Sequence, residues 1–303
     1  MVVKSNNTHL NILASYAYLG KSKSFCDTFF GYSKDGVINT MIDSGAFTLF
    51  NKKGSLSWLT LDNYCKFLET YSQYSEKYVM LDVINNHEQS KINYETMIDR
   101  GLKPMFVFTS LDKDYTYLKQ AVDNNPHLCV AGGVTTKGEW MSKRFQDVYL
   151  KTKALIHGLG YVKFPTIYQL PLHSVDSSTW IQGAQAFGHL FYFNEGLKAI
   201  AHSHILKRKV KMPIKLIENL DRYKISPKQF SNIDNHRGGD SIETMLSIIA
   251  YIEYQKYSKE RGINLFLAGS SRTNVDDIVF INNQLTKGTL TYEKYRNRKS
   301  NNS

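Results

Sequence analysis

The chain has 303 residues, of which 42% are hydrophobic and 21% are charged, as is typical of a globular protein with a sizeable core. Its 38 lysines and arginines outnumber its 27 aspartates and glutamates, so the formal net charge is +11. This excess predicts an anionic partner, with nucleic acid as the leading candidate, although scattered surface lysines would give the same balance.

The sequence also argues against two classes of protein. Cys26, Cys65 and Cys129 stand alone, without a CxxC or CxC pair, so neither a structural zinc site nor a disulfide framework is expected. Residues 1–10 are largely polar, and no stretch approaches the roughly 20 apolar residues of a membrane span. We therefore expect a soluble protein of the reducing cytoplasm with no membrane partner.

Apolar strand-like segments alternate with helix-forming segments along the first half of the chain. Apolar runs predict strands at residues 11–18, 37–42, 78–83, 104–108 and 128–134. Helical spacing and N-terminal signals predict helices at residues 60–74, 94–100, 115–123 and 139–155. This alternation is typical of βαβ units and of a parallel sheet.

The strands are short and apolar and end near Asp, Gly or Ser, which favours a (β/α)8 TIM barrel with its chemistry at the C-terminal strand ends. A doubly wound open sheet is the alternative. No GxGxxG follows the first strand and no GxxxxGK[ST] occurs, which removes the usual grounds for that alternative. We expect one barrel domain over residues 1–295, with an irregular, basic C-terminal third, and a disordered tail over residues 296–303.

The last third carries three further signals. The basic run Lys207, Arg208 and Lys209 would suit phosphates, although such runs are more often solvated faces. A helix is expected to start near residues 240–243 and to be part of the core, because its apolar residues form one stripe: Ile242, Met245, Leu246, Ile249 and Ile252. Residues 266–272 indicate a closing strand with a small-residue loop that ends at Arg272, a place where barrels often hold a phosphate.

Three aspartates would lie at C-terminal strand ends of such a barrel and face one mouth: Asp43, Asp82 and Asp176. Gly45 and Phe47 follow the first of them and supply a tight turn and an apolar surface. Converging carboxylates suit chemistry at a sugar C1′, where one attacks, another moves a proton and a third binds a purine edge. A Mg²⁺ site would use the same residues, and Asp43 would also suit a plain Ser-Gly turn.

The order of these motifs resembles a known family, the queuine and archaeosine tRNA-guanine transglycosylases. Ile42–Phe47 is similar to their DSGGF signature, with Ala46 in place of the second glycine. Leu81-Asp82 resembles their guanine-reading strand end, and residues 131–134 resemble their GG loop. Residues 157–160 are similar to their MGVG turn, and Val175-Asp176 lies where they carry the nucleophile.

Two departures set the chain apart from the tRNA enzymes. It lacks their CxCxxC…H zinc site, and Thr179 stands where a second acid of the nucleophile segment would be. The shorter form, with the HGLG and SVDSSTW stretches, is more similar to the 7-deazaguanine DNA transglycosylases of phages and bacterial islands, the DpdA type. That resemblance implies exchange of guanine in DNA for a 7-deazaguanine through a covalent deoxyribosyl-enzyme.

The resemblance and the basic run together imply the following site. The catalytic residues are Asp43, as general acid and base, and Asp176, as nucleophile. The base-binding residues are Ser44, Gly45, Phe47, Asp82, Gly132, Gly133, His157 and Gly158, where a structural role for the histidine is the alternative. The nucleic-acid contacts are Lys207, Arg208, Lys209 and Arg272.

No metal and no cofactor are implied. The partners are double- or single-stranded DNA and a 7-deazaguanine base, with a helper protein left open. A transglycosylase that acts on tRNA and a non-catalytic nucleic-acid-binding barrel are the alternatives.

Overall fold

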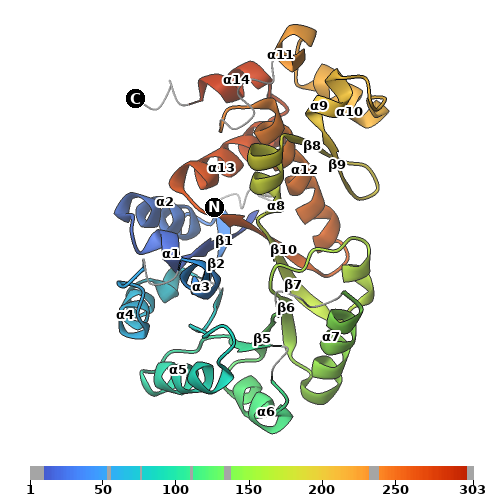
Figure 1. Ribbon diagram of the computed structural model, residues 1–303. Coiled ribbons are helices and arrows are strands. Elements are labelled where there is room, and N and C mark those ends of the chain that lie inside the picture. The colour runs from blue at the N-terminus through green and yellow to red at the C-terminus, as the bar shows by residue number, and fades with distance from the viewer. Residues whose placement is uncertain are drawn as a thin grey trace, which may run out of the picture. The chain divides into compact units, whose positions relative to one another are not determined.

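The computed structural model describes residues 10–52, 56–75, 77–109, 112–132, 138–231 and 239–298. The chain forms two compact units (Figure 1). Unit 1 comprises Met1–Ser177 and Arg261–Arg272, and unit 2 comprises Ser178–Glu260 and Thr273–Ser303. The single domain expected over residues 1–295 stays a prediction.

Unit 1 is an α/β fold built on a curled parallel sheet, in which the described residues form eight strands. Their order is β3-β2-β1-β10-β7-β6-β5-β4, and all neighbouring pairs are parallel. The strands are β1 Leu10–Ser15, β2 Ile38–Asp43, β3 Lys77–Tyr78, β4 Phe106–Phe108, β5 His127–Val130, β6 Leu155–Gly158, β7 Leu172–Ser177 and β10 Asn264–Gly269. The arrangement resembles a (β/α)8 barrel, because the strands follow one another in chain order around the sheet.

The residues next to the two outer strands of that order, β3 and β4, approach each other at one point. Val79 forms an isolated parallel bridge with Met105. The Met105 N–H donates to the Tyr78 carbonyl at 2.8 Å, and the Met80 N–H donates to the Met105 carbonyl at 3.0 Å. The sheet is therefore strongly curled, and residues next to its two outer strands approach each other, although among the described residues β3 and β4 are not paired as strands and the barrel is not fully closed.

Helices follow most strands of unit 1 and lie outside the curled sheet (Figure 1). They are α1 Tyr16–Leu19, α2 Lys23–Lys34, α3 Ala46–Asn51, α4 Leu61–Tyr71, α5 His87–Asp99, α6 Tyr115–Asn124 and α7 Gly138–Thr152. Short 3-10 turns complete the set at Ser72–Tyr74 and Thr166–Gln169. The predicted helix start at Thr60 is confirmed, since its hydroxyl accepts from the Asn63 N–H at 3.3 Å.

Several predicted boundaries were wrong. The helix expected at residues 94–100 already starts at His87, and the strands expected at 78–83 and 128–134 are shorter, Lys77–Tyr78 and His127–Val130. Two further differences have a local cause. The first strand ends at Ser15 and not at residue 18, because the Ser15 hydroxyl accepts the Ala17 N–H and starts α1. The helix expected to run to residue 155 ends at Thr152, where Lys153 takes a left-handed backbone (φ 58°), and Leu155 begins β6.

Unit 2 packs around one long helix, α12 (Ile242–Lys259), which is buried on nearly all sides. The predicted stripe is confirmed as core, and Ser241 caps the helix by accepting from the Thr244 N–H at 3.1 Å. The other elements are α8 Thr179–Ile181, a π-helical turn Gln182–Ala186, the antiparallel hairpin β8 His189–Phe193 and β9 Leu197–Ala201, α9 His202–Leu206, α10 Ile214–Arg222, α11 Pro227–Ser231, α13 Arg272–Thr286, whose first residue belongs to unit 1, and α14 Tyr292–Asn297.

The prediction that disorder begins at residue 296 was wrong. Helix α14 continues to Asn297, and Arg298 is buried. Its guanidinium forms a two-pronged ion pair with Asp277, with Nε to Oδ1 at 2.5 Å and Nη2 to Oδ2 at 2.7 Å. Charge pairing holds this polar segment, which composition alone marked as solvated. Residues 299–303 lie outside the described residues.

Candidate active site

Asp43 is the last residue of β2, where it faces the end of β1. The parallel register pairs Ser15 with Asp43, so both side chains lie on one face of the sheet. The Ser15 hydroxyl donates to the Asp43 carboxylate, and the Gly45 N–H donates to its Oδ2 at 3.0 Å. Burial raises the pKa of Asp43, and the charge of Asp176 raises it further, while Ser15, Gly45 and His157 lower it. The net shift favours a carboxyl that can carry a proton.

Asp176 lies in β7 beside β6. Its Oδ1 accepts from the Gly160 N–H at 2.7 Å and lies 3.2 Å from His157 Nε2. On the other side of the imidazole, Nδ1 lies 2.8 Å from Ser174 Oγ. Ser174 and Asp176 are two residues apart on one strand, so they share a face, and β6 holds His157 against that face. The described residues place no hydrogen bond on Asp176 Oδ2.

Asp82 follows β3, and its surroundings differ from those of Asp43 and Asp176. Burial raises its pKa to about 7, and the charges of Asp43 and Asp112 contribute in the same direction. Asp112, just beyond β4, is buried and accepts from the N–H and the hydroxyl of Thr109, both at 2.7 Å. Asp112 is therefore a fourth acid, close enough for its charge to raise the pKa of Asp82, the candidate for binding the base.

Cys129 of β5 lies within electrostatic range of the three predicted aspartates. Burial raises its pKa well above that of a free thiol, and the charges of Asp176, Asp43 and Asp82 raise it further. The registers pair Cys129 with His157. Because the charges of all three carboxylates raise the pKa of this buried thiol, the three acids lie in one region of unit 1.

Gly45 has a backbone conformation that residues with a side chain rarely adopt. Its φ is +86°, and a Cβ there would lie 2.7 Å from the Ala17 Cβ and 3.0 Å from Ser15 Oγ. Any side chain at residue 45 would therefore disturb both Ser15 and the turn that holds Asp43. Ser44, directly before it, is fully buried.

The other base-binding candidates divide into two groups. His157 and Gly158 are buried in β6 next to Asp176. Phe47, in contrast, is 62% exposed in α3. Gly132 is exposed directly after β5. Gly133 lies outside the described residues.

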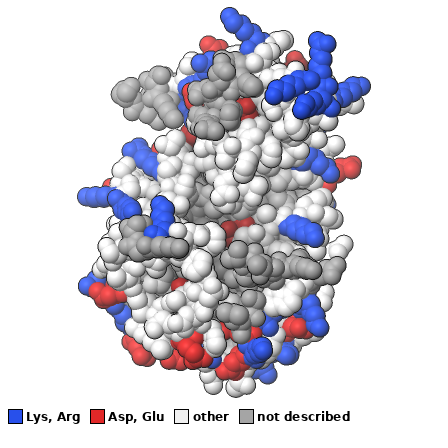
Figure 2. All heavy atoms as spheres, in the orientation of Figure 1, with Lys and Arg blue, Asp and Glu red and all other residues white. Residues whose placement is uncertain are grey.

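The nucleic-acid candidates are all exposed. Lys207, Arg208 and Lys209 follow α9 in unit 2. Figure 2 shows lysine and arginine side chains gathered over the region where Figure 1 labels α9 and α10. Arg272 begins α13, and its Nη1 donates to Ser24 Oγ at 3.1 Å within unit 1.

Four residues near the acids were not predicted. Ser15, Asp112, Gly160 and Ser174 each bind or charge-couple to a predicted site residue. Ser174 was within reach of the sequence, because it stands two residues before Asp176 on a predicted strand end and so must share its face. The sequence indicates a turn at residues 157–160, but the contact made by the Gly160 N–H was not predicted, because a backbone donor leaves no side-chain pattern.

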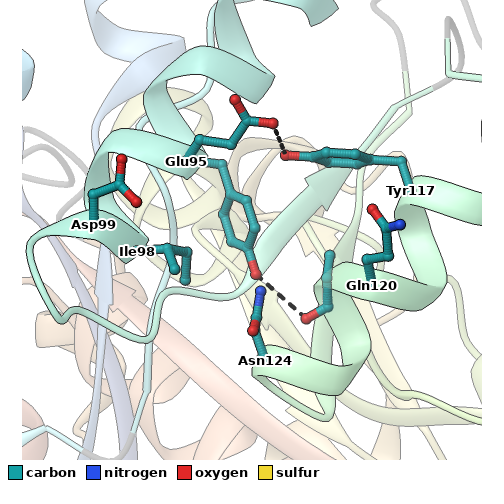
Figure 3. Close-up of a pocket in the computed structure, with 8 residues that line it drawn as sticks. Glu95, Ile98, Asp99, Tyr117, Gln120 and Asn124 are labelled. Carbon is teal, nitrogen blue, oxygen red and sulfur yellow. Dashed lines mark hydrogen bonds between the residues drawn. The ribbon is translucent and has the colours of Figure 1, made fainter.

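A hollow on the outer surface of unit 1 lies apart from this cluster, between α5 and α6 (Figure 3). Tyr94 and Tyr117 line it together with Glu95 and Asp99. Tyr117 donates its hydroxyl to Glu95 at 3.2 Å, and Tyr94 donates to the Ala121 carbonyl at 3.3 Å. The polar groups of the two tyrosines are thus already bonded within the protein.

Comparisons with known proteins give no assignment. No protein-family model matches the chain, and neither a curated protein nor a solved structure does. Among the described helices, none has the length and apolar character needed to cross a membrane. In the same part of the chain, no three His, Cys, Asp or Glu side chains group closely enough to hold a metal ion.

Proposed function

We propose that the chain is a base-exchanging transglycosylase that replaces guanine in DNA with a 7-deazaguanine. The observation that carries the proposal is the contrast between two coupled carboxyls at strand ends. Asp43 has a raised pKa, whereas Asp176 is bound by a backbone N–H and lies against an imidazole. Two carboxyls in different environments are what an acid and a nucleophile require.

In the first displacement, Asp176 Oδ2 attacks C1′ of the deoxyribose. The C1′–N9 bond breaks, and the departing guanine takes a proton from Asp43. The hydrogen bond from Gly160 and the contact with His157 both involve Oδ1. They fix the carboxylate and leave the second oxygen for the bond to C1′.

In the second displacement, the incoming deazaguanine gives its N9 proton to Asp43. N9 then forms the bond to C1′, and the C1′–Oδ2 ester bond breaks. Two inversions give net retention at C1′. Asp43 ends with its proton restored, so one carboxyl serves both half-reactions without a cofactor.

Asp82 is proposed to bind the purine edge. Its ionised carboxylate can accept from a ring N–H and an exocyclic amine together. A pKa of about 7 means that base binding and deprotonation of this carboxyl are coupled near neutral pH. The partner of each acid is thus a different part of one nucleotide.

We also propose that the sheet of unit 1 is a closed (β/α)8 barrel. The strand order, in which the two ends of the row are the consecutive strands β3 and β4, and the bridge between Val79 and Met105 support closure. In such a barrel the strand ends that carry Asp43, Asp82 and Asp176 open on one face.

Incorporation of labelled guanine tests the reaction. The purified protein is incubated with tritiated guanine and either duplex DNA, single-stranded DNA or tRNA, and the label that remains with polymer is counted. Label in DNA but not in tRNA is expected. Label in tRNA alone would favour a tRNA transglycosylase, which uses the same chemistry. No label in either, with DNA binding retained, would favour a non-catalytic nucleic-acid-binding protein.

A further inference from the structure

The connection between α9 and α10 in unit 2 combines exposed cations with exposed aliphatic side chains. The α9–α10 ridge is defined here by seven exposed residues: Lys207, Arg208, Lys209, Val210, Lys211, Ile214 and Ile217. Ile214 is 75% exposed, Ile217 50% and Val210 41%. Aliphatic side chains this exposed, gathered on one segment, indicate a surface that contacts another molecule.

The cations of the ridge meet no acid within salt-bridge distance among the residues that the structure describes. The nearest pair along the chain is Lys215 with Glu218, at 3.5 Å and outside the ridge. Four exposed cations within five residues, without an acid partner in the described ranges, are complementary to a row of phosphates.

Arg208 also occupies a backbone position that arginine does not favour. Its φ is +53°, and it follows Lys207, the C-cap residue of α9. Its N–H donates to the Ile205 carbonyl, and the following Lys209 N–H donates to the His204 carbonyl. A helix end of this form is usually closed by glycine. The arginine there places a long cationic side chain where glycine would be the less strained residue.

We propose that the α9–α10 ridge docks on duplex DNA, with its cations on phosphates and Ile214 and Ile217 wedged against a base step. The inference rests on the proposed function in that DNA is taken as the partner. A base stacked in a duplex must leave the stack before enzymes can act on it. Aliphatic wedges beside cations are a known means of unstacking a step.

The side-chain types favour a duplex over other anionic partners. Proteins that bind single strands stack bases on aromatic rings, and residues 207–217 contain no aromatic side chain. A membrane-bound helix keeps its charged face basic, whereas α10 exposes Glu218 and Asp221 beyond the ridge. These acids also limit the phosphate-binding surface to the N-terminal part of α10.

The first test measures binding of a fluorescent duplex at several salt concentrations. Replacing the four cations with Gln should weaken binding and lower the log–log salt slope by roughly 0.9 for each phosphate that the variant no longer neutralises. Arg208→Gly should weaken binding and leave the melting temperature equal or higher. Lys153→Gly is the matched control, because Lys153 is an exposed lysine at φ 58° after α7. Equal loss of affinity in both Gly variants would overturn the phosphate assignment.

The second test follows unstacking with a duplex that carries 2-aminopurine beside guanine. Wild-type protein should raise the fluorescence, and Ile214→Ser/Ile217→Ser should lose most of the rise. Leu150→Ser, at a 66% exposed position of α7, is the control. The ratio of guanine exchange on duplex to exchange on single strand should fall at least tenfold in the double variant. An unchanged fluorescence rise and ratio would overturn the wedge.

The same variants distinguish failure of the ridge proposal from failure of the transglycosylase proposal, and DNA binding from membrane binding. If no DNA is exchanged by any form, but the binding and fluorescence results hold, the ridge stands and the transglycosylase assignment falls. If the double variant loses binding to phosphatidylserine vesicles while its duplex binding and unstacking match the wild type, the ridge contacts membranes and the DNA proposal is overturned.

Discussion

His157 lies between Ser174 and Asp176, with Nδ1 2.8 Å from the serine hydroxyl and Nε2 3.2 Å from Oδ1 of the aspartate. A neutral imidazole carries one N–H. The tautomer that donates from Nε2 to Asp176 therefore accepts at Nδ1 from the Ser174 hydroxyl. We infer that Ser174 and His157 are positioning residues for the proposed nucleophile.

This arrangement predicts a specific kinetic effect. His157→Leu removes the contact with Asp176 and should lower kcat for exchange by roughly 10- to 100-fold, since small misplacement of a reacting group has that effect. KM for DNA should stay within threefold. Ser174→Ala should give a smaller loss in the same parameter, and Ser174→Thr, which keeps a hydroxyl, should restore much of it. A change in KM with kcat unchanged would instead indicate substrate binding.

Asp82→Asn should stabilise the protein in a pH-dependent way. The pKa of Asp82 is about 7 in the folded protein, against an ordinary value of 3.8. The folded state therefore holds this proton more tightly than the unfolded state, and stability falls as pH rises between the two values. The variant should gain on the order of 2–4 kcal/mol over wild type at pH 8 and almost nothing at pH 3.5.

Urea unfolding of both proteins at the two pH values measures this difference directly. The comparison at each pH cancels the titration of other groups to a first approximation. An equal gain at both values would mean that the carboxyl of Asp82 is not the titrating group.

Gly45→Ala should unfold more easily than wild type by about 2–4 kcal/mol, because it combines a left-handed backbone with a collision against Ala17. Gly36→Ala is the matched control. Gly36 has φ +66°, but a Cβ there meets nothing within 4 Å, so only the backbone cost of about 1 kcal/mol applies. Similar losses in the two variants would show that the collision at residue 45 is relieved at no cost.

The buried pair of Arg298 and Asp277 should matter for unit 2. Removing one partner by Arg298→Met or Asp277→Ala should cost about 3–5 kcal/mol, because the other charge stays buried without its counter-ion. The double variant should lose less than the sum of the two. Urea unfolding monitored by circular dichroism measures all three, and additive losses would contradict a coupled pair.

Much of unit 1, and the start of α12 in unit 2, could be predicted from the sequence. Short apolar strands that end at Asp43 and Asp176 give the parallel α/β sheet, since buried parallel strands have a recognisable apolar pattern. Helix starts marked by Thr60 and Ser241 were also predicted, because their hydroxyls cap the backbone locally. These signals depend on neighbouring residues and need no tertiary contact.

The remaining features depend on contacts between distant residues. The hairpin of β8 and β9 was not predicted, because its residues 189–201 mix aromatic, charged and small side chains without alternation. The order at Arg298 comes from Asp277, 21 residues away. At the site, the residue types of Asp43 and Asp176 are visible in sequence. Their different environments come from Ser15 and Gly160, which only folding brings near.

The central claim is a covalent ester between Asp176 and C1′ of DNA. Wild type, Asp176→Asn and Asp43→Asn are each incubated with radiolabelled duplex DNA without an incoming base, denatured and resolved by gel electrophoresis. We predict a protein–DNA adduct in wild type, none in Asp176→Asn, and slow formation in Asp43→Asn, since proton transfer contributes about 10²–10⁴-fold. An adduct that persists in Asp176→Asn and is absent from Asp43→Asn would reverse the two roles. Adduct loss in Thr179→Val alone would place the nucleophile segment elsewhere, and either result would contradict the account.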